Sequence, residues 1–436
     1  MNTIDHIKER FHKLQATGSA HSLKLLEQKA FDEFNLLGIP TVRHEEWKYT
    51  RINSLFNKEY SYLQEKTSGS FSSAEFGHFH LPGYEEANEI VFVNGIYSTE
   101  LSTVRSSSLK VMSLEDASNN EFKDIVNAHL GHSSKYLNDG INALNSAFLN
   151  SGIFINVQNG KILEHPVYIY HITDAKNANV LAQPRSLVYV GQNAQARFTE
   201  TYVTVGESDS LINQVLELIV EKDAIVEYYK IQNDKENSNQ VSTTHIRQIG
   251  KSYVHTVTIS LNRGLVRNNL NVVLEAEQSE AHLYGLYYTT GNSHIDNHTI
   301  VDNVKPNCFS NEFYKGILDG NSTGVFNGKI YVRPQAQKTN AYQSNKNILL
   351  SANSSVNTKP QLEIFADDVK CSHGCTIGKL DEEGMFYLQS RGINKKDARS
   401  LLLHSFAVDV LKHIKSAPIR KYVEQLISER LEFEFI

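Results

Sequence analysis

The stretch Gln214–Gln232, QVLELIVEKDAIVEYYKIQ, decides the fold class, because it joins two strand-like runs through a short polar turn at Lys222. Both runs are rich in β-branched and aromatic residues, which fit a pleated backbone. Runs of the same kind follow one another from Gly152 to about Gly378 without a helical pattern between them. They include PVYIYHI, RSLVYVG, ARFTETYVTV, YVHTVTISL, LNVVLEA, AHLYGLYYT, GKIYVR and QLEIFA. This part of the chain is therefore predicted to be all β.

A long succession of strands without helices has two solutions. One is an antiparallel sandwich or barrel, and the other is a coiled parallel β-helix in which each strand stacks on its counterpart one turn later. The unbroken length of the region and the scarcity of Asn-Gly hairpin signals favour the β-helix. So does the quasi-regular spacing of the turn clusters. These clusters lie near Gly191, Lys222, Gly250 and Glu277. The residue pattern alone leaves both solutions open.

Helical patterns flank the β region and divide the chain into three parts. Residues 1–85 are predicted to be mostly helical, with a polar link at residues 66–76. Residues 86–378 form the β core, which also contains a helical passage at about residues 119–150. Residues 379–436 are predicted to form a C-terminal helical domain.

The C-terminal helices carry two clear signals. Asn394 is predicted to cap a helix, and a further helix is predicted to begin at about Pro418. Between them lies an apolar stripe made of Leu403, Ala407, Val410 and Ile414. A stripe of this kind needs a surface to cover it. We expect that surface to be the protein's own core. The alternative is that a partner subunit covers the stripe.

Composition excludes several classes of function. The 436 residues are too many for one compact core, and the net charge of −6 argues against a nucleic-acid or anionic-membrane surface. The start, MNTIDHIKERFHKLQ, is charged and lacks the apolar segment of a secretory signal. No apolar run approaches the roughly 18 residues of a membrane span. Three cysteines do not make a disulfide framework, so we expect a cytoplasmic, reducing location in which thiols are available for metal or sulfur chemistry.

The segment 366–379, ADDVKCSHGCTIGK, brings Cys371, His373 and Cys375 within five residues. In an extended strand the three side chains point to the same side. Thiolate and imidazole donors on one face suit zinc or iron, although a fourth ligand is missing nearby. A cysteine nucleophile activated by the histidine is a second interpretation. A third is a pair of inert buried thiols beside a hydrogen-bonded histidine.

Two other polar segments contain residues that could form a site. His294, Asp296 and His298 alternate, so an extended strand would place them on one face as a metal site or, as we favour, as a polar ladder inside or beside a β-coil. Cys308, in the turn KPNCFS, is predicted to be unreactive.

The segment GNSTGVFNGK, residues 320–329, resembles a phosphate-binding loop but fails the pattern. Position 323 is Thr where the motif requires Gly, and position 330 is Ile where it requires Ser or Thr. The chain is therefore predicted to have no ATP site.

Several short sequence motifs between Asn311 and Ile393 are similar to those of the SufB/SufD family of iron–sulfur cluster assembly proteins. The word HEEWKYT after Arg43 also resembles the amino-terminal part of SufD. The words in the main match are EFYKGILDG, GVFNGKIYVRP, AQKTNAYQSN, TKPQLEIFADDVKCSHG and FYLQSRGI.

Within this family the chain resembles the SufD branch. The SufB scaffold carries a cysteine in the word before RGI, where this chain has Leu388, and CSHG after ADDVK is the SufD form. Cys375 departs from the family pattern, which usually has a small residue without a thiol there. No role is therefore carried onto Cys375.

The resemblance implies a mainly β fold, a right-handed parallel β-helix flanked by N-terminal and C-terminal helical regions. It implies a non-catalytic subunit that forms a heterodimer with SufB near the C-terminal ends of the two β-helices. The helical tail is expected to dock SufC, an ABC-type ATPase, and the isolated chain is a possible homodimer.

The resemblance also places the C-S-H word at the SufB interface. There His373 is expected to bind iron or a transient iron–sulfur cluster shared with SufB, with Cys371 as a second, weaker ligand. SufB would supply the remaining donors. Lys315 and Arg333, in the matching words, are interpreted as structural.

Two other classes of function compete with this expectation. A carbohydrate enzyme on a β-helix needs paired carboxylates, and Asp367 and Asp368 would face opposite sides of an extended strand. A pure interaction scaffold would use the C-S-H word only for packing. Replacing His373 by alanine separates a scaffold of that kind from a metal-binding subunit.

Overall fold

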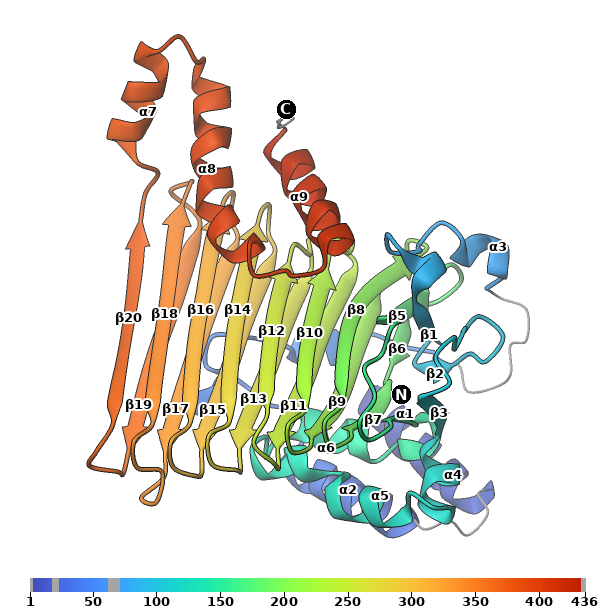
Figure 1. The fold of residues 1–436 in the computed structure, drawn as a ribbon. Coiled ribbons are helices and arrows are strands. Elements are labelled where there is room, and N and C mark those ends of the chain that lie inside the picture. The colour runs from blue at the N-terminus through green and yellow to red at the C-terminus, as the bar shows by residue number, and fades with distance from the viewer. Residues whose placement is uncertain (1–2, 18–22, 62–70, 433–436) are drawn as a thin grey trace.

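The computed structural model describes residues 3–17, 23–61 and 71–432. Its centre is a β-solenoid of about eight turns, in which successive strands alternate between two facing sheets (Figure 1). The long ladders within each sheet are parallel, as between β16 and β18. The prediction of a parallel β-helix with helices on both flanks is confirmed, and the antiparallel sandwich is wrong.

One sheet, which we call sheet B, ends at β20. Its strands follow the spatial order β2-β1-β5-β8-β10-β12-β14-β16-β18-β20, and only β1 and β2 pair antiparallel. Their bounds are β1 Asn88–Val93, β2 Ile96–Tyr97, β5 Val167–Asp174, β8 Gln195–Val205, β10 Ile225–Gln232, β12 Tyr253–Ser260, β14 Glu280–Thr289, β16 Phe309–Leu318, β18 Asn340–Leu349 and β20 Lys370–Gly378.

The other sheet, sheet A, ends at β19. Its order is β19-β17-β15-β13-β11-β9-β7-β4-β3, with β6 paired to β9 beside this path and with β3 antiparallel to β4. The bounds are β3 Leu109–Ser113, β4 Ile153–Val157, β6 Val180–Ala182, β7 Arg185–Val190, β9 Ser210–Val220, β11 Ser238–Gln248, β13 Leu265–Leu274, β15 His294–Asn303, β17 Thr323–Val332 and β19 Ser355–Ile364.

The turns that lead from sheet A to sheet B repeat one backbone conformation. Five of them contain a residue other than glycine with φ between 57° and 60°: Asn193, Asp223, Gln278, Asn307 and Lys338. Asn and Asp enter this left-handed region more easily than other side chains. This preference explains some of the Asn and Asp residues in the turns between strands. The turns also bond to one another, because the N–H of Asn193 donates to the carbonyl of Lys222 at 2.9 Å. The stacking of the coils therefore continues through their turns.

The interior of the solenoid is apolar for most of its length but contains a buried charged group. Apolar side chains from both sheets, among them Ile155 and Leu218, form the main core. In the middle coils, Glu200 lies 2.7 Å from His171 and 3.4 Å from Lys230, and all three side chains are almost fully buried. Because each charge has a partner of opposite sign, the burial of this group is tolerated.

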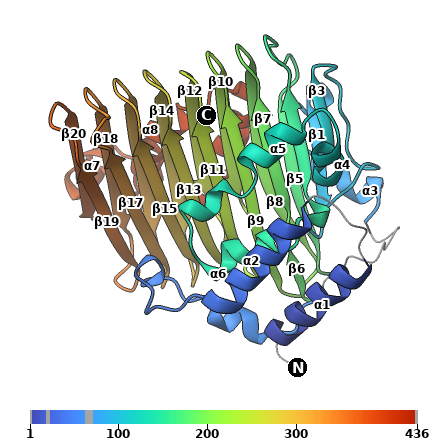
Figure 2. The same cartoon turned by 90° about the horizontal axis from the view of Figure 1, so that it is seen from below.

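Helices from the N-terminal half cover the outer face of sheet A (Figure 2). Phe31, Phe34 and Trp47 pack there with Leu144 and Val241 in one hydrophobic cluster. The elements before β1 are α1 Thr3–Thr17, α2 Lys24–Leu37, η1 Glu45–Trp47, η2 Asn53–Asn57, α3 Ser73–Phe76 and η3 Tyr84–Glu86. A polar link is predicted at residues 66–76. Residues 66–70 of this link lie outside the described residues, and residues 71–76 contain the short helix α3.

The helical passage predicted at about residues 119–150 begins earlier and is not one helix. It consists of α4 Leu114–Asn119, α5 Lys123–His129, η4 His132–Lys135, α6 Gly140–Ser146 and η5 Leu149–Ser151. Gly131, at a positive φ of 84°, ends one segment, and Asp139 starts another by accepting N–H hydrogen bonds from Ile141 and Asn142. Local backbone chemistry therefore divides a pattern that looks continuous in the sequence.

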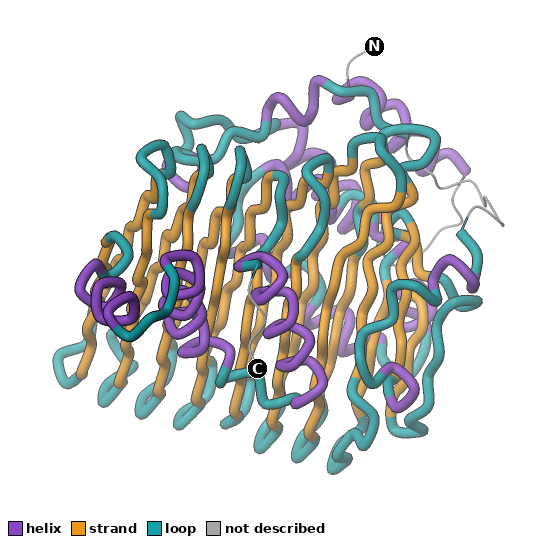
Figure 3. The backbone as a smooth tube through the Cα atoms, turned by 90° about the horizontal axis from the view of Figure 1, so that it is seen from above, coloured by secondary structure: helices purple, strands orange, loops and turns teal. Residues whose placement is uncertain are grey.

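The C-terminal helices α7 Glu382–Ser390, α8 Lys395–Leu411 and α9 Ala417–Leu431 follow β20 (Figure 3). Asn394 caps α8 as predicted, and the apolar stripe packs on the outer face of sheet B against Tyr229, Val257 and Leu286. The stripe therefore covers the protein's own core. Lys315 reinforces this contact, because its Nζ lies 2.7 Å from Asp409 on α8.

Candidate functional site

The C-S-H word lies on β20, the last strand of sheet B. Cys371 pairs in register with Ala341 of β18, His373 with Gln343, and Cys375 with Asn345. Because those three partners are buried in the solenoid interior, the side chains on β20 continue interior columns. The prediction that the three side chains share one side of a strand is confirmed.

The same residues are not enclosed, because β20 ends its sheet. His373 and Cys375 are exposed, whereas Cys371 is half-buried and packs against the main core. Burial raises the pKa of the Cys371 thiol. Cys308 lies deep in a turn between sheets, and burial raises its pKa to about 11. The three thiols of the chain therefore differ strongly in access.

This difference predicts an order of alkylation. In the native protein, iodoacetamide is expected to modify Cys375 first and Cys371 more slowly, and to modify Cys308 at least about tenfold more slowly than Cys375, since the reactive species is an accessible thiolate. Mass spectrometry of peptides from a time course at pH 8 measures the three rates. In urea the three rates should converge, and equal rates in the native protein would contradict the assignment.

The floor beneath His373 is polar. Gln343 donates its amide N–H to Glu312 at 2.6 Å, while one amide or carboxyl oxygen of each residue has no hydrogen-bond partner in the structure. Burial raises the pKa of Glu312 to about 7, although the neighbouring polar side chains of Thr299 and Gln343 act to lower it. Sequence reasoning missed these two residues. For Gln343 a signal was present, because polar side chains occupy the inward positions 343, 345 and 347 of NAYQSNKN in β18.

The described part of the chain does not enclose a metal site by itself. Within residues 3–17, 23–61 and 71–432, no group of three or more His, Cys, Asp or Glu side chains could hold a metal ion. Cys371 and His373 lie two residues apart on β20 and offer a soft and a borderline donor. A metal bound there would need further donors from beyond the described residues. The two ligand assignments therefore stay predictions.

The second polar pattern, His294 to His298, is a ladder on the outside of the coil. His298 Nε2 lies 3.1 Å from one oxygen of Asp296, and Arg267 Nη1 lies 3.0 Å from the other. Burial opposes ionisation of Asp296, but His298 and Arg267 together hold its pKa well below its usual range. Thr50 Oγ1 also contacts His294 Nε2 at 2.9 Å. This arrangement confirms the interpretation as a polar ladder beside a β-coil.

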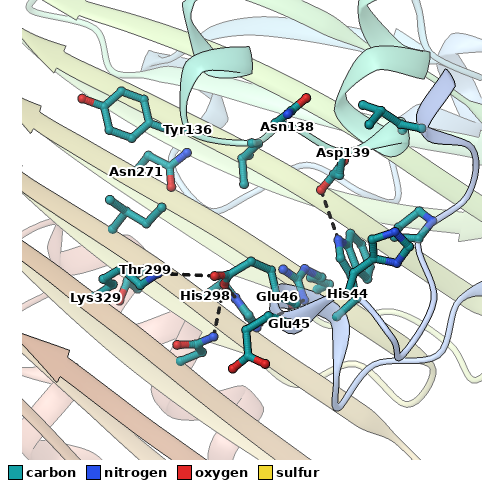
Figure 4. A pocket seen from close by; sticks show the side chains of 18 of the residues that line it. His44, Glu45, Glu46, Tyr136, Asn138, Asp139, Asn271, His298, Thr299 and Lys329 are labelled. Atoms are coloured by element: carbon teal, nitrogen blue, oxygen red, sulfur yellow. Dashed lines mark hydrogen bonds and ion pairs between the residues drawn. The ribbon is translucent and has the colours of Figure 1, made fainter. Parts of the chain in front are cut away.

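The word HEEWKYT lies against that ladder. Glu46 contacts His298 at 3.6 Å (Figure 4). Trp47 is buried, and the guanidinium of Arg267 lies 3.9 Å from the centroid of the Trp47 ring. Contacts between residues so far apart in sequence cannot be deduced from spacing. They attach the N-terminal segment to the outer face of sheet A.

Helix α7 contrasts with the other C-terminal helices. None of its residues is buried, and Phe386 and Tyr387 are 76% and 57% exposed. Only residues 379–381 separate it from β20. An exposed aromatic pair on a projecting helix is typical of a surface that contacts another protein.

Among the helices of the described residues, none combines the length and the apolarity that crossing a membrane requires.

Comparison with known proteins agrees with this geometry. The family model "SUF system FeS cluster assembly, SufBD core domain" matches residues 171–406, and the model "SufBD protein N-terminal region" matches residues 2–169. An iron–sulfur cluster assembly SufBD family protein of Synechocystis is 31% identical, over 92% of this chain and 90% of its own length. The iron–sulfur cluster assembly protein SufD of Escherichia coli is 27% identical, over 99% and 98%. A chloroplastic protein of Arabidopsis thaliana, ABCI7, is 31% identical, over 61% and 58%.

Proposed function

The chain belongs to the SufBD family of iron–sulfur cluster assembly proteins, and from this membership we propose that it is a non-catalytic SufD-type subunit that pairs with SufB. It would help to gather iron and sulfide at the shared seam. The observation that carries the proposal is the position of the C-S-H word, which lies on the last strand of the solenoid with its side chains in line with the interior columns.

The open end of the solenoid has the properties of a subunit interface. Beside β20 and β19, Ile364, Phe365 and Ile377 are 39%, 57% and 51% exposed. An uncovered terminal strand also presents backbone groups that can pair with another chain. A second solenoid that stacks on this end would bury the apolar side chains and bring its own donors over His373. SufB is the partner that the family suggests.

At that seam His373 is the first candidate for an iron ligand, because it is exposed and its ring lies over a polar floor. Cys371 is the weaker candidate, because it packs on the core and burial disfavours its thiolate. A cluster held by donors from two chains can be assembled when the chains meet and released when the seam shifts. The cluster is cargo in this proposal and not a resident cofactor.

The C-terminal helices offer a route by which a second partner would act on the seam. The exposed face of α7 is the proposed dock for SufC, and residues 379–381 connect α7 directly to β20. Meanwhile α8 is tied to the sheet by Lys315–Asp409 and by Arg399–Asp319, at 2.7 and 2.8 Å. A nucleotide-dependent change in SufC that favours one position of α7 would therefore bias β20.

The test is His373→Ala in the chain co-expressed with SufB and SufC. The complex is expected to purify intact, while anaerobic reconstitution yields at least about tenfold less cluster, because a direct ligand is lost. Absorbance and Mössbauer spectra of the complex measure the bound cluster. His78→Ala, which removes an exposed histidine far from β20, is the matched control and should leave the yield unchanged.

Two outcomes would contradict parts of the proposal. Unchanged cluster yield in an intact complex would remove His373 from the ligand set. Failure of the complex to form would mean that the histidine serves packing at the seam, and the function would then be that of an interaction scaffold.

A further inference from the structure

The last strand of sheet B carries three possible metal donors, but its two thiols are too far apart to bind the same ion. Cys371, His373 and Cys375 lie on one side of β20 at the open end of the solenoid (Figure 1). A rise of roughly 3.3 Å per residue puts the Cα atoms of the two cysteines roughly 13 Å apart. Two sulfurs on one zinc ion are at most about 4.6 Å apart, since each Zn–S bond is about 2.3 Å long. The short cysteine side chains cannot make up the difference, so His373 can share an ion with only one of them.

Exposure separates the two thiols. Cys375 is exposed, like His373, whereas Cys371 is half-buried and packs against the main apolar core. The sulfur of Cys371 would have to leave that core to meet an ion beside His373, and it would lose apolar contacts. Cys375 is already at the surface. The exposed thiol is therefore the one that an ion reaches at the lower cost.

The strand beneath β20 also distinguishes the two thiols. In the register between β18 and β20, Cys371 lies beside Ala341, whereas Cys375 lies beside Asn345. Gln343 occupies the inward position between these two partners. An ion held between residues 373 and 375 therefore has two amide side chains beneath it, while an ion held between residues 371 and 373 has a methyl group on one side. A charged centre is less disfavoured beside polar groups than beside apolar ones.

The two amides of this floor are held in place by their own hydrogen bonds. Asn345 is completely buried, and its amide nitrogen donates to the hydroxyl of Tyr287 and to the carbonyl of Tyr314, both at 3.3 Å. Its amide oxygen accepts from Asn347 at 2.6 Å. Gln343 is tied to the strand below it in the same way. The support beneath Cys375 is thus formed before any ion arrives, as a precise site requires.

The chemistry of the exposed pair suits a divalent ion of borderline softness. A thiolate is a soft donor and an imidazole a borderline one, and zinc and iron accept both. A tetrahedral zinc ion holds a sulfur and a nitrogen ligand about 3.6 Å apart. Residues two apart on a strand have Cα atoms roughly 7 Å apart, and the longer imidazole can lean toward the thiol across that distance. The thiol releases its proton to solvent when it binds, and water completes the coordination.

We propose that Cys375 is the thiol partner of His373, and that the two form a half-site for Fe²⁺ or Zn²⁺ at the open end of the solenoid. The family resemblance carries no role onto Cys375, so the assignment comes from the geometry of β20 and its neighbour. It deepens the proposed function by naming the second donor, and it rests on that function only for the identity of the cargo. The isolated chain would bind the ion without SufB.

Titration of the tag-free full chain with Co²⁺ tests the proposal, because a cobalt–thiolate bond absorbs in the near ultraviolet by charge transfer. We expect a saturable band from the wild type at pH 8 under anaerobic conditions. Cys375→Ser is expected to lose the band, and His373→Ala to raise the Kd at least about tenfold, because each removes one donor of the pair. Cys371→Ser, the matched control on the other side of His373, should keep both the band and the Kd.

Alkylation gives a second readout that needs no variant. Zn²⁺ is expected to slow the modification of Cys375 by iodoacetamide at least about tenfold, because a metal-bound thiolate is not free to react. The rate at Cys371 should stay unchanged. Thermal melting shows whether each variant is folded, and the alkylation rates of the wild type decide the question if Cys375→Ser does not fold.

Three outcomes would overturn the proposal. A band that survives Cys375→Ser and disappears in Cys371→Ser would assign Cys371 as the thiol. A band that His373→Ala leaves unchanged would show adventitious binding to an exposed thiol only. The absence of a saturable band up to millimolar Co²⁺ would show that β20 holds no ion by itself. If the cluster yield of the complex with SufB and SufC still depended on His373 in that case, the proposed function would stand and only the half-site would be wrong.

Discussion

Replacing Arg185 by methionine is expected to lower the free energy of unfolding by about 3–5 kcal/mol, because it leaves a buried carboxylate without its partner. Arg185 Nη2 lies 2.5 Å from Glu217 Oε2, and both side chains are completely buried between sheet A and the helices that cover it. Glu217 also accepts the backbone N–H groups of Gly131 and Ser133 at 2.8 and 2.7 Å. The ion pair thus joins the sheet to the covering segment.

The electrostatics support this size of effect. Burial opposes ionisation of Glu217, yet Arg185 and His245 together hold its pKa below the usual value. Without the guanidinium the carboxyl must either stay charged in an apolar site or take up a proton. Urea unfolding, followed by circular dichroism at pH 7, measures the loss.

Two further variants control this prediction. Arg197→Met breaks a similar ion pair to Glu227 on sheet B, with a separation of 2.7 Å, but this arginine is 39% exposed, so a loss of about 0–1 kcal/mol is expected. The double variant Arg185→Met with Glu217→Gln should recover part of the lost stability, since it removes both charges and keeps an acceptor for the buried N–H groups of Gly131 and Ser133. A loss for Arg185→Met as small as that for Arg197→Met would contradict the argument.

Glu312→Gln is expected to stabilise the protein at alkaline pH and to leave it unchanged in acid. The pKa of Glu312 is raised by burial to about 7 from an ordinary value of 4.5, so the folded chain holds a proton that the unfolded chain has released. Stability from this group is complete below about pH 4.5 and is lost as the pH rises to about 7. The difference of about 2.5 pK units corresponds to about 3 kcal/mol.

Glutamine keeps the shape of the side chain and cannot ionise. Above pH 7 the variant should therefore exceed the wild type by about 3 kcal/mol, and near pH 4 the two should agree. Urea unfolding at a series of pH values gives the difference curve. Glu236→Gln, at an exposed position, should follow the wild type throughout. A flat difference curve for Glu312→Gln would show that this carboxyl is not held neutral.

Sequence reasoning succeeded where the structure depends on local chemistry. The cap at Asn394 and the strand runs around Lys222 were found from residue type and spacing, since capping and pleating act over a few residues. The choice between a sandwich and a solenoid was open on the residue pattern, because both contain similar strands and differ only in which strands pair. The family resemblance resolved it in favour of the solenoid.

The candidate site shows the same limit. That Cys371 and His373 share a face follows from the alternation of a strand. That the face continues the solenoid interior follows only from the register with Ala341 and Gln343. The contact of Glu46 with His298 joins segments about 250 residues apart in sequence, and nothing in either segment alone indicates it. Burial of Glu312 was missed because its strand contains inward and outward polar residues alike.

The stacking of coils through strands and turns has a mechanical consequence. In such an array each layer is held by the layers on either side, so the layer at the end is held by one neighbour only. Detaching β20 breaks a single ladder and leaves the other coils in place, which makes this strand the point at which the array frays first. Cys371 and His373 therefore lie on the strand that detaches most easily. A partner that binds β20 would also determine how long this strand stays attached to the solenoid.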